Sequence, residues 1–278
     1  MNYKITFGAL CAALSISGAA VAQDKYTVAL DGTFAPHAMP SLSGGVEGFN
    51  VDLANLIGER LGVEMDIVAT QFSGILPGLA AGTYDFVVAP TTITAERADS
   101  VLFSEGYLNT DFQFVVKAGA EDVPDLEALK GKIIAVNKGS VYDSWAREKG
   151  EEIGWTVESY GTNSDAVQAV VSGRAFANVA GNTVSAWAVK QNPAIELSYL
   201  FTTGLVWGMP FRKGDEELRA KVETVIECLK VDGTMAGLSE KWFGVTPQPG
   251  SAAITPQPGF GEPEFAGYVM DDHTPGCE

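Results

Sequence analysis

The chain has 278 residues and a formal charge of −17, because 35 Asp and Glu residues outnumber 18 Lys and Arg residues. An excess of negative charge this large opposes binding to nucleic acid and to anionic membrane surfaces, since both would repel it. The length is sufficient for one large or two medium-sized domains, and no apolar run reaches the roughly 18 residues that a membrane-spanning helix needs.

Residues 1–22 have the features of a secretory signal peptide. Lys4 is the single charge of this segment, an apolar stretch runs from Ile5 to Ala19, and Ala20-Val21-Ala22 is a small-x-small cleavage signature. Removing the segment takes away one lysine and no acidic residue, so the formal charge changes from −17 to −18. We therefore expect a protein that is exported to the periplasm.

Short β-type runs then alternate with helical patterns, which is typical of an α/β protein with a mostly parallel sheet. The first part of the chain predicts, in order, a strand at Tyr26–Leu30, a helix with inward Leu53, Leu56, Ile57 and Leu61 ending at Gly62, a strand at Glu64–Ala69, a helix at Ser73–Ala81 and a strand at Phe86–Ala89.

The stretch Asp85–Arg97 predicts an anion-binding site. Its strand is stopped by Pro90 and the threonines that follow, and Thr94 then opens a helical turn that carries Arg97. Free N–H groups at a helix start favour an anion, and a planar guanidinium can bind both oxygens of a carboxylate. Taken alone, the motif fits a strand-to-helix loop with a surface arginine equally well.

The same architecture restarts at Lys130 as though a second copy were inserted. It predicts strands at Gly131–Val136, Trp155–Tyr160 and Ala175–Ala180, a helix opening at Gly139–Asp143, a helix at Asn163–Ser172, and a helix at Asp215–Val231 that rejoins the first part. We interpret the chain as two α/β lobes, with residues 23–110 and 206–245 forming the first lobe and residues 111–205 the second. The two hinge crossovers are expected near Leu108–Gln113 and Phe201–Val206.

Residues 246–278 form a tail rich in Pro and Gly. The sequence Thr246-Pro-Gln-Pro-Gly250 is repeated at Thr255–Gly259, which predicts a semi-extended segment that serves as a spacer or docks along the surface. Cys277 of the tail and Cys228 of the last predicted helix can form a disulfide in an oxidising compartment, although their spacing alone does not show it.

Several motifs in register resemble the periplasmic solute-binding proteins of ABC importers, in the family 3 group that takes up polar amino acids. They are Gly48–Ala54, Ile75–Leu79 with Gly82–Asp85, Thr92–Arg97, Phe103–Tyr107, Leu129–Lys132, and Asp232–Thr234 with Lys241–Gly244. The resemblance runs from about Lys25 to Gly244. It implies a type II periplasmic-binding-protein fold, in which a monomeric two-lobed clamp closes on a small molecule and delivers it to a membrane ABC permease.

The resemblance also implies a set of ligand-binding residues. Arg97 would hold the ligand carboxylate, helped by Thr92 and by the loop that contains Pro90. Phe34 and Phe72 would form aromatic walls, and Ser140 would offer its hydroxyl from a helix start. We add two candidates from the sequence itself: Asn182, which stands beside the departing position Gly181, and Asp31, which could supply a negative charge from another direction. Each has a structural alternative, since aromatic side chains are usually buried in a core and serine is a common helix cap.

The sequence departs from the family pattern at Gly181. Amino-acid binders commonly place an aspartate there to receive the ligand ammonium group, whereas this chain has a glycine with Asn182 beside it. An ammonium group without that partner would lose a charge-assisted hydrogen bond worth roughly 1.5–3 kcal/mol. We hypothesise that the ligand keeps a carboxylate but lacks an ordinary free α-amino group. Other residues could supply the charge or a cation–π contact instead: Asp31, Glu47, Glu105, Trp207, Tyr142 or Trp145.

The main alternative is an exported enzyme, because periplasmic cyclohexadienyl dehydratases resemble this family. Such an enzyme needs a general acid in the cleft, and neither Gly181 nor Asn182 titrates. The sensory module of a membrane receptor would need a spanning helix that the sequence lacks. His37 and His273 are far apart in sequence, and no Cys/His cluster has ligand spacing, so we expect no metal and no cofactor.

Overall fold

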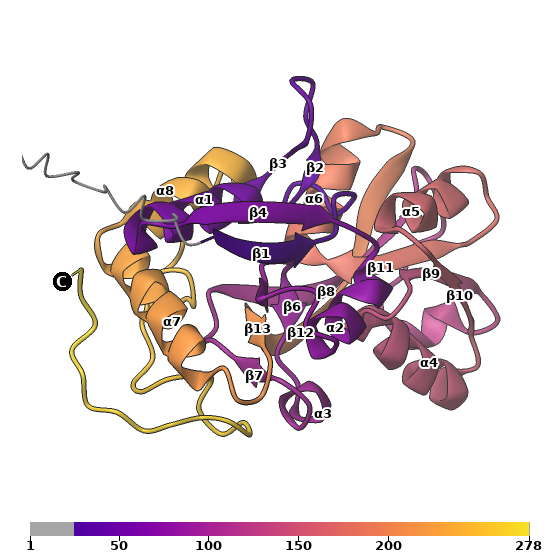
Figure 1. Ribbon diagram of the computed structural model, residues 1–278. Coiled ribbons are helices and arrows are strands. Elements are labelled where there is room, and N and C mark those ends of the chain that lie inside the picture. The colour runs from indigo at the N-terminus through magenta and orange to yellow at the C-terminus, as the bar shows by residue number, and fades with distance from the viewer. Residues whose placement is uncertain (1–24, 278) are drawn as a thin grey trace, which may run out of the picture.

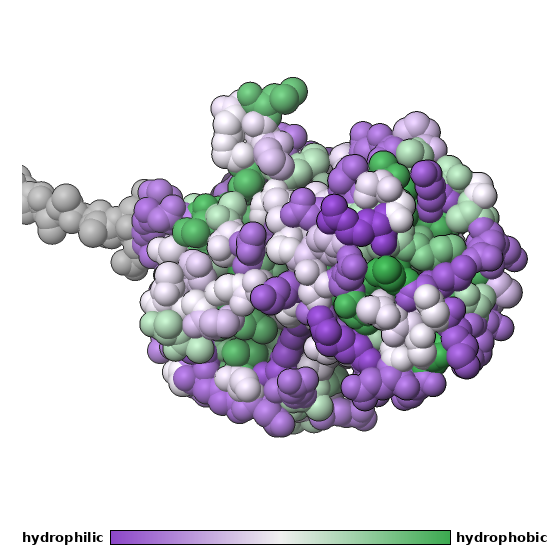
Figure 2. Space-filling view, turned by 90° about the vertical axis from the view of Figure 1, so that its right-hand side faces the viewer, coloured by the Kyte–Doolittle hydropathy of each residue, from purple (hydrophilic) through white to green (hydrophobic). Residues whose placement is uncertain are grey.

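The computed structural model describes residues 25–277, and the expected signal peptide lies outside them. The described chain forms two α/β lobes that lie side by side (Figure 1). No helix within these residues is long and apolar enough to cross a membrane. Figure 2 shows hydrophilic side chains over most of the face at the second-lobe end, with apolar residues in small separate groups.

The first lobe is built on a five-stranded sheet with the order β4-β1-β5-β13-β7. Its strands are β1 (Lys25–Leu30), β4 (Glu64–Ala69), β5 (Phe86–Val87), β7 (Leu102–Phe103) and β13 (Pro210–Phe211). Its helices are α1 (Phe49–Leu61), α2 (Phe72–Ala80), α3 (Ala95–Ala98), α7 (Glu216–Val231) and α8 (Thr234–Phe243), and a hairpin of β2 (Met39–Pro40) and β3 (Val46–Glu47) projects from it (Figure 1). β1 is parallel to β4 and β5, as expected of a βαβ arrangement.

The second lobe is built on a six-stranded sheet with the order β10-β9-β11-β8-β12-β6. Its strands are β6 (Thr91–Thr92), β8 (Leu108–Lys117), β9 (Ile133–Asn137), β10 (Thr156–Tyr160), β11 (Ala177–Gly181) and β12 (Ile195–Gly208). The helices α4 (Val141–Ile153), α5 (Asn163–Val171) and α6 (Asn182–Gln191) pack on these strands, and a short 3-10 helix spans Leu126–Leu129. Because β13 returns to the first sheet after the second is complete, the second lobe is inserted into the first.

The elements differ from the prediction in ways that have physical reasons. The expected strand at 86–89 ends at Val87, and Thr91–Thr92 instead pairs with β12 of the other sheet. The helices α6 and α8 and most of the 14-residue β12 were not predicted, since α6 follows β11 without a turn signal and β12 alternates polar and apolar residues only in part.

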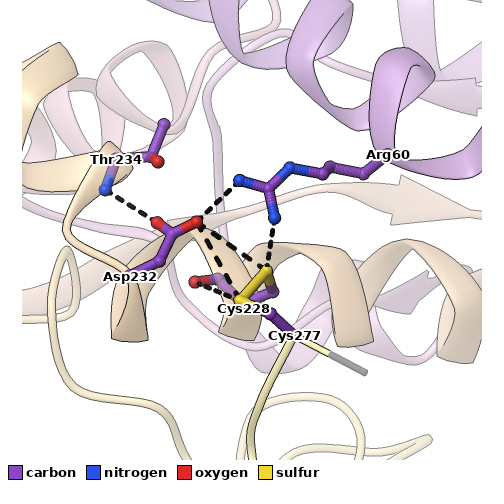
Figure 3. Close-up of a disulfide and its surroundings, with 5 residues drawn as sticks. All are labelled: Arg60, Cys228, Asp232, Thr234 and Cys277. Carbon is purple, nitrogen blue, oxygen red and sulfur yellow. Dashed lines mark hydrogen bonds and ion pairs between the residues drawn. A yellow bond between two sulfur atoms is a disulfide. The ribbon is translucent and has the colours of Figure 1, made fainter.

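The tail lies along the first lobe beside α7 and contains no helix or named strand (Figure 1). A disulfide joins its Cys277 to Cys228 of α7. Arg60 donates a 2.8 Å hydrogen bond to the Cys228 sulfur and pairs with Asp232 at 2.6 Å, while the Thr234 N–H donates to the same carboxylate group (Figure 3). The tail is therefore fixed to the first lobe at its far end.

Buried ionisable side chains fix the middle of the tail. Lys230 of α7 pairs with Glu105 at 2.7 Å, both side chains being fully buried, and also donates to the Thr255 carbonyl of the tail. The Glu223 carboxylate accepts from the N–H groups of Glu105 and Gly261, at 3.0 and 2.6 Å. Burial raises the pKa of Glu223 to about 8. The Pro- and Gly-rich segment is thus part of the packed structure, although it lacks regular elements.

Candidate functional site

A cavity lies between the two lobes, and the space that it marks, including the open space at its mouth, is about 320 Å³. Seven of the eight predicted ligand-binding residues line it: Asp31, Phe34, Phe72, Pro90, Thr92, Arg97 and Ser140. The lining also includes Ala89 of the expected binding loop and the alternative candidates Tyr142 and Trp207, and the structure adds Asn137 and Val141. Asn182 is not brought to this cavity; it lines a separate surface pocket together with Trp187 and Trp242.

Arg97 supplies the positive charge of the cavity. Thr94 caps α3 by accepting from the Arg97 N–H at 3.3 Å, and the guanidinium donates to the carbonyls of Thr92 (2.9 Å) and Gly139 (3.4 Å). Its carbon lies 5.7 Å from the centre of the Phe72 ring. Burial lowers the pKa of Arg97 to about 10, so the group stays charged at neutral pH. Within residues 25–277 no carboxylate forms an ion pair with it.

Ser140 is the N-cap of α4, and its hydrogen-bonding capacity is partly used. Its hydroxyl donates to the Asn137 carbonyl at 2.6 Å and accepts from the Asp143 N–H at 3.2 Å. The neighbouring Gly139 N–H donates to the Asp143 carboxylate at 3.1 Å. The structural role of Ser140 as a cap is therefore present, and its contact with a ligand stays a prediction.

Asp31 is the only carboxylate among the residues that line the cavity. One of its oxygens accepts from the N–H and hydroxyl of Thr33, at 3.0 and 2.7 Å, and the other accepts from the Asn137 side-chain amide at 3.3 Å. The alternatives Glu47 and Glu105 lie elsewhere, in the hairpin and in the buried pair with Lys230. A ligand cation in this cavity thus has one acidic side chain to face.

Asn137 lines the cavity but was not predicted from the sequence. It is the last residue of β9, is 1% exposed, and its side-chain oxygen has no hydrogen-bond partner among the described residues. The available signal was its position: a polar residue at the carboxyl end of a strand, immediately before the turn at Gly139. Such strand ends commonly line the binding crevice of α/β proteins.

Aromatic side chains form the remaining walls. Phe34 and Phe72 are buried, and Trp207 is 1% exposed with its indole N–H donating to the Thr92 hydroxyl at 3.1 Å. The Tyr142 hydroxyl is buried without a partner in the described chain, and burial raises its pKa to about 12. The Trp207 and Tyr142 rings therefore lie where a cation–π contact with a ligand is feasible, and that role stays a prediction. Trp145 lies outside the cavity and packs against Phe112, with ring centres 5.1 Å apart.

The position expected to hold an aspartate has no room for a side chain. A Cβ atom on Gly181 would lie 2.7 Å from the Trp207 ring and 2.8 Å from the Tyr142 hydroxyl. Real Cβ atoms essentially never approach other atoms so closely. The wall above Gly181 is therefore neutral, and a carboxylate could be placed there only if these two rings moved.

Hydrogen bonds between the two lobes hold them together. Besides Arg97 to Gly139 and Asn137 to Asp31, Ser164 donates to the Thr33 carbonyl at 3.2 Å. His37 of the first lobe lies 2.8 Å from the Thr183 hydroxyl of α6. Gly139 also packs against Ser73 of α2, since a Cβ on Gly139 would lie 3.2 Å from it. The described conformation is therefore a closed one.

These features are those of a clamp-type binding protein. Two α/β lobes, one inserted into the other, are closed over a small cavity that has a cation on one wall. The chain belongs to the bacterial extracellular solute-binding proteins, family 3, whose model matches residues 26–245. The tail that follows Val245 lies beyond the matched region.

Curated and solved relatives agree with this assignment. The chain is 32% identical over 219 residues to the L-cystine-binding protein TcyJ of Escherichia coli K12, covering 78% of this chain and 82% of the relative. It is similar to the structure of an ancestral arginine-binding protein bound to arginine, with a TM-score of 0.77, 36% identity, and coverage of 80% and 99% of the two chains. An ancestral amino acid-binding protein, AncCDT-1, described as a precursor of cyclohexadienyl dehydratase, gives a TM-score of 0.73, 33% identity, and coverage of 79% and 95%.

Proposed function

We propose that this protein is the periplasmic substrate-binding component of an ABC importer and that it binds an amino acid or amino-acid-derived carboxylate between its lobes. The observation that carries the proposal is Arg97, a charged guanidinium that lines the cavity without an ion-pair partner among the described residues. A ligand carboxylate would supply that partner. Relatives named for binding cystine and arginine support the same ligand class.

The dependence of closure on the ligand supports an importer role. Arg97 belongs to the first lobe, and Ser140 and Tyr142 belong to the second, so a ligand can touch all three only when the lobes are shut. A ligand that binds the closed form better shifts the hinge equilibrium towards it. The partner that recognises the closed shape would be a membrane ABC permease, and we propose that the receptor acts as a monomer.

The ligand must be compact. Phe34, Phe72 and Trp207 enclose the cavity and exclude water, which strengthens the charged contacts inside. The neutral wall above Gly181 favours a ligand without an ordinary ammonium group at that wall. Asp31, on another side, is the residue that could receive a cationic nitrogen.

A thermal-shift screen of carboxylate metabolites tests the proposal, because a tight ligand stabilises the folded protein in proportion to the logarithm of its concentration over its dissociation constant. The screen should include amino acids, cyclic imino acids, betaines, opines and simple organic acids. We expect at least one to raise the melting temperature of the protein and to lose that effect in Arg97→Ala.

Arg174→Ala is the matched control, since Arg174 is exposed on the second lobe and lies outside the cavity. It should respond to the ligand as the unmodified protein does. If Arg97→Ala binds as tightly as Arg174→Ala, the carboxylate anchor lies elsewhere and the proposal is wrong.

A second candidate is an enzyme of the cyclohexadienyl dehydratase type, which the similarity to AncCDT-1 brings into consideration. The titratable side chains that line the cavity are Asp31, Arg97 and Tyr142. Neither Gly181 nor Asn182 can supply the general acid that such an enzyme needs, and the relatives are named as binding proteins, so binding is the better-supported function. Incubation with prephenate and with arogenate should give no turnover; product formation above the uncatalysed rate would favour the enzyme.

A further inference from the structure

The tail contacts the segment through which the chain passes from the first sheet to the long strand β8. β7 belongs to the sheet of the first lobe and β8 to the sheet of the second, so the passage lies between Phe103 and Leu108. We call residues 104–109 the first crossover. The tail follows the part of the chain that matches the family, residues 26–245, so the family assignment does not account for these contacts.

A part of the tail, residues 252–262, is hydrogen-bonded to the first crossover, and we call it the strap. The Glu262 carboxylate accepts from the Gly106 N–H at 2.8 Å. The side-chain oxygen of Asn109, the second residue of β8, accepts from the Ala252 N–H at 2.9 Å. The strap is therefore joined to the crossover near both of its own ends.

A buried cation reinforces the middle of the strap. The Gln257 N–H donates to the Glu105 carboxylate, which is fully buried and pairs with Lys230 of α7 at 2.7 Å. The same ammonium group donates to the carbonyls of Gly106 and Thr255, at 2.7 and 3.3 Å. One side chain of the first lobe thus binds the crossover and the strap together. Because these groups are buried, separating them would leave charges without partners.

The strand that returns to the first lobe lies in the same cluster. The chain comes back between β12 and β13, and Val206 of β12 pairs with Asn109 of β8. Val206 also lies against Gly106, since a Cβ there would be 2.5 Å from its side chain and 3.2 Å from the Glu262 carboxylate. The strap therefore backs both strands on which the expected hinge lies.

A hinge can bend only where its backbone is free to rotate. The strap holds the first crossover to α7 and so confines the bending of β8 to residues after Asn109. Without the strap, the crossover would add rotatable backbone bonds to the hinge, and the second lobe could take more orientations in the open form.

We infer that the strap is a conformational restraint on the hinge: by holding the first crossover to the first lobe, it limits the open orientations of the second lobe. For a ligand bound between the lobes, as proposed above, fewer open orientations mean a smaller loss of entropy on closure. Within the described chain no tail residue lines the cavity, so the strap acts on binding through the hinge alone.

Pulsed electron resonance between two spin labels tests the restraint without any ligand. The labels are attached at Glu59→Cys in α1 and Glu151→Cys in α4, which are exposed positions on opposite lobes. The native cysteines are joined in a disulfide and are not free to take a label. Glu262→Leu removes the acceptor of the Gly106 N–H, so the spread of label-to-label distances should widen roughly twofold. Glu262→Gln keeps an acceptor oxygen and should stay close to the unmodified protein.

Two controls separate a hinge restraint from a general loss of stability. Asp272→Leu removes an exposed acidic residue of the same tail, outside the strap. Ile57→Val removes one buried methyl group from α1, which lowers stability but leaves the strap intact. Both variants should keep the spread of distances of the unmodified protein.

Asn109→Leu is an independent variant, because it removes the acceptor of the Ala252 N–H at an exposed position and should fold even where Glu262→Leu does not. It should widen the spread in the same way. If the strap variants match Asp272→Leu, or if Ile57→Val widens the spread as much as they do, the tail only stabilises the first lobe and the inference is overturned. That result would leave the proposed function standing, since no ligand enters the measurement.

Discussion

His37 lies at the contact between the two lobes, and its neighbours determine which ring nitrogen carries the proton. The amide of Asn50 donates to the Val88 carbonyl and the Tyr107 hydroxyl, so its oxygen accepts from Nδ1 of His37 at 2.9 Å. Nε2 is then free to accept from the Thr183 hydroxyl at 2.8 Å. The ring is fully buried, and burial lowers the pKa of His37 to about 3.

This pKa makes stability depend on pH. In the unfolded state the histidine has its ordinary pKa of about 6.5. Between pH 6.5 and pH 3 the unfolded protein therefore binds a proton at His37 that the folded protein does not bind. Stability from neutral His37 is therefore complete above about pH 6.5 and is lost as the pH falls towards 3. Between pH 7 and pH 5 the loss should be about 2 kcal/mol.

Urea unfolding at the two pH values measures this loss in the unmodified protein and in His37→Gln. The variant should lack the His37 contribution, so its decrease should be smaller by about 2 kcal/mol. The pKa of His273 is raised by its hydrogen bond to Glu227, which acts in the opposite direction but is shared by both proteins. Equal pH dependence in the two proteins would show that His37 does not titrate as described.

At the scale of elements, α7 carries both a buried and a surface ion pair. Lys230 and Glu105 are fully buried at 2.7 Å, whereas Lys221 and Glu217 are 55% and 85% exposed at the same distance. Lys230→Met would leave Glu105 buried without its partner, so we expect a loss of about 3–5 kcal/mol in unfolding free energy. Lys221→Met should cost less than about 1 kcal/mol. Chemical denaturation measures both, and similar losses would contradict this account of the buried pair.

The disulfide at the end of the tail should add to stability. It joins residues 49 apart, and loops of this length give about 2–4 kcal/mol through restriction of the unfolded chain. Replacing both cysteines, Cys228→Ser with Cys277→Ser, should lower the unfolding free energy by this amount and abolish any response to reductant. A response that persists in the double variant would have another origin.

The elements also show what could be read from the sequence. The end of α1 at Gly62 was predicted and is confirmed, because a left-handed φ of 69° there favours glycine. Thr94 as the cap of α3 was predicted for the same kind of local reason and is confirmed. Pairing between β6 and β12 depends on residues more than 100 positions apart, and local patterns contain no information about such partners.

For the whole molecule, closure is the property that the site depends on. Gly139 has a φ of +76°, and a Cβ there would meet Ser73 of the opposite lobe at 3.2 Å. Gly139→Ala should therefore weaken the closed form and reduce ligand affinity several-fold. Gly173→Ala is its control, because Gly173 has the same φ but nothing within 4 Å. Calorimetry compares the affinities, and small-angle scattering with ligand should show less compaction for Gly139→Ala. Equal behaviour would mean that this contact does not restrain closure.

The fold class was accessible to sequence analysis because alternating strands and helices, with a restart at Lys130, indicate two α/β lobes. The lining of the cavity was accessible only in part. Arg97 could be identified because it is a single arginine in a capped turn. Asn137 could not, because it is recognised as a site residue only through its hydrogen bond to Asp31, which is 106 residues away and on the other lobe. Likewise, the lack of space at Gly181 comes from Trp207 and Tyr142, which no local pattern places beside it.

The anchorage of the tail has a practical consequence for reporter design. Its contacts reach Glu105, Glu223, Glu227 and Cys228, all at the base of the first lobe. A fluorophore attached to the described part of the tail, close to Cys277, would therefore move together with that lobe. A second dye could be attached to the opposite lobe through an engineered Arg174→Cys. Energy transfer between the two dyes would then report the movement of the lobes, and neither label would lie in the cavity.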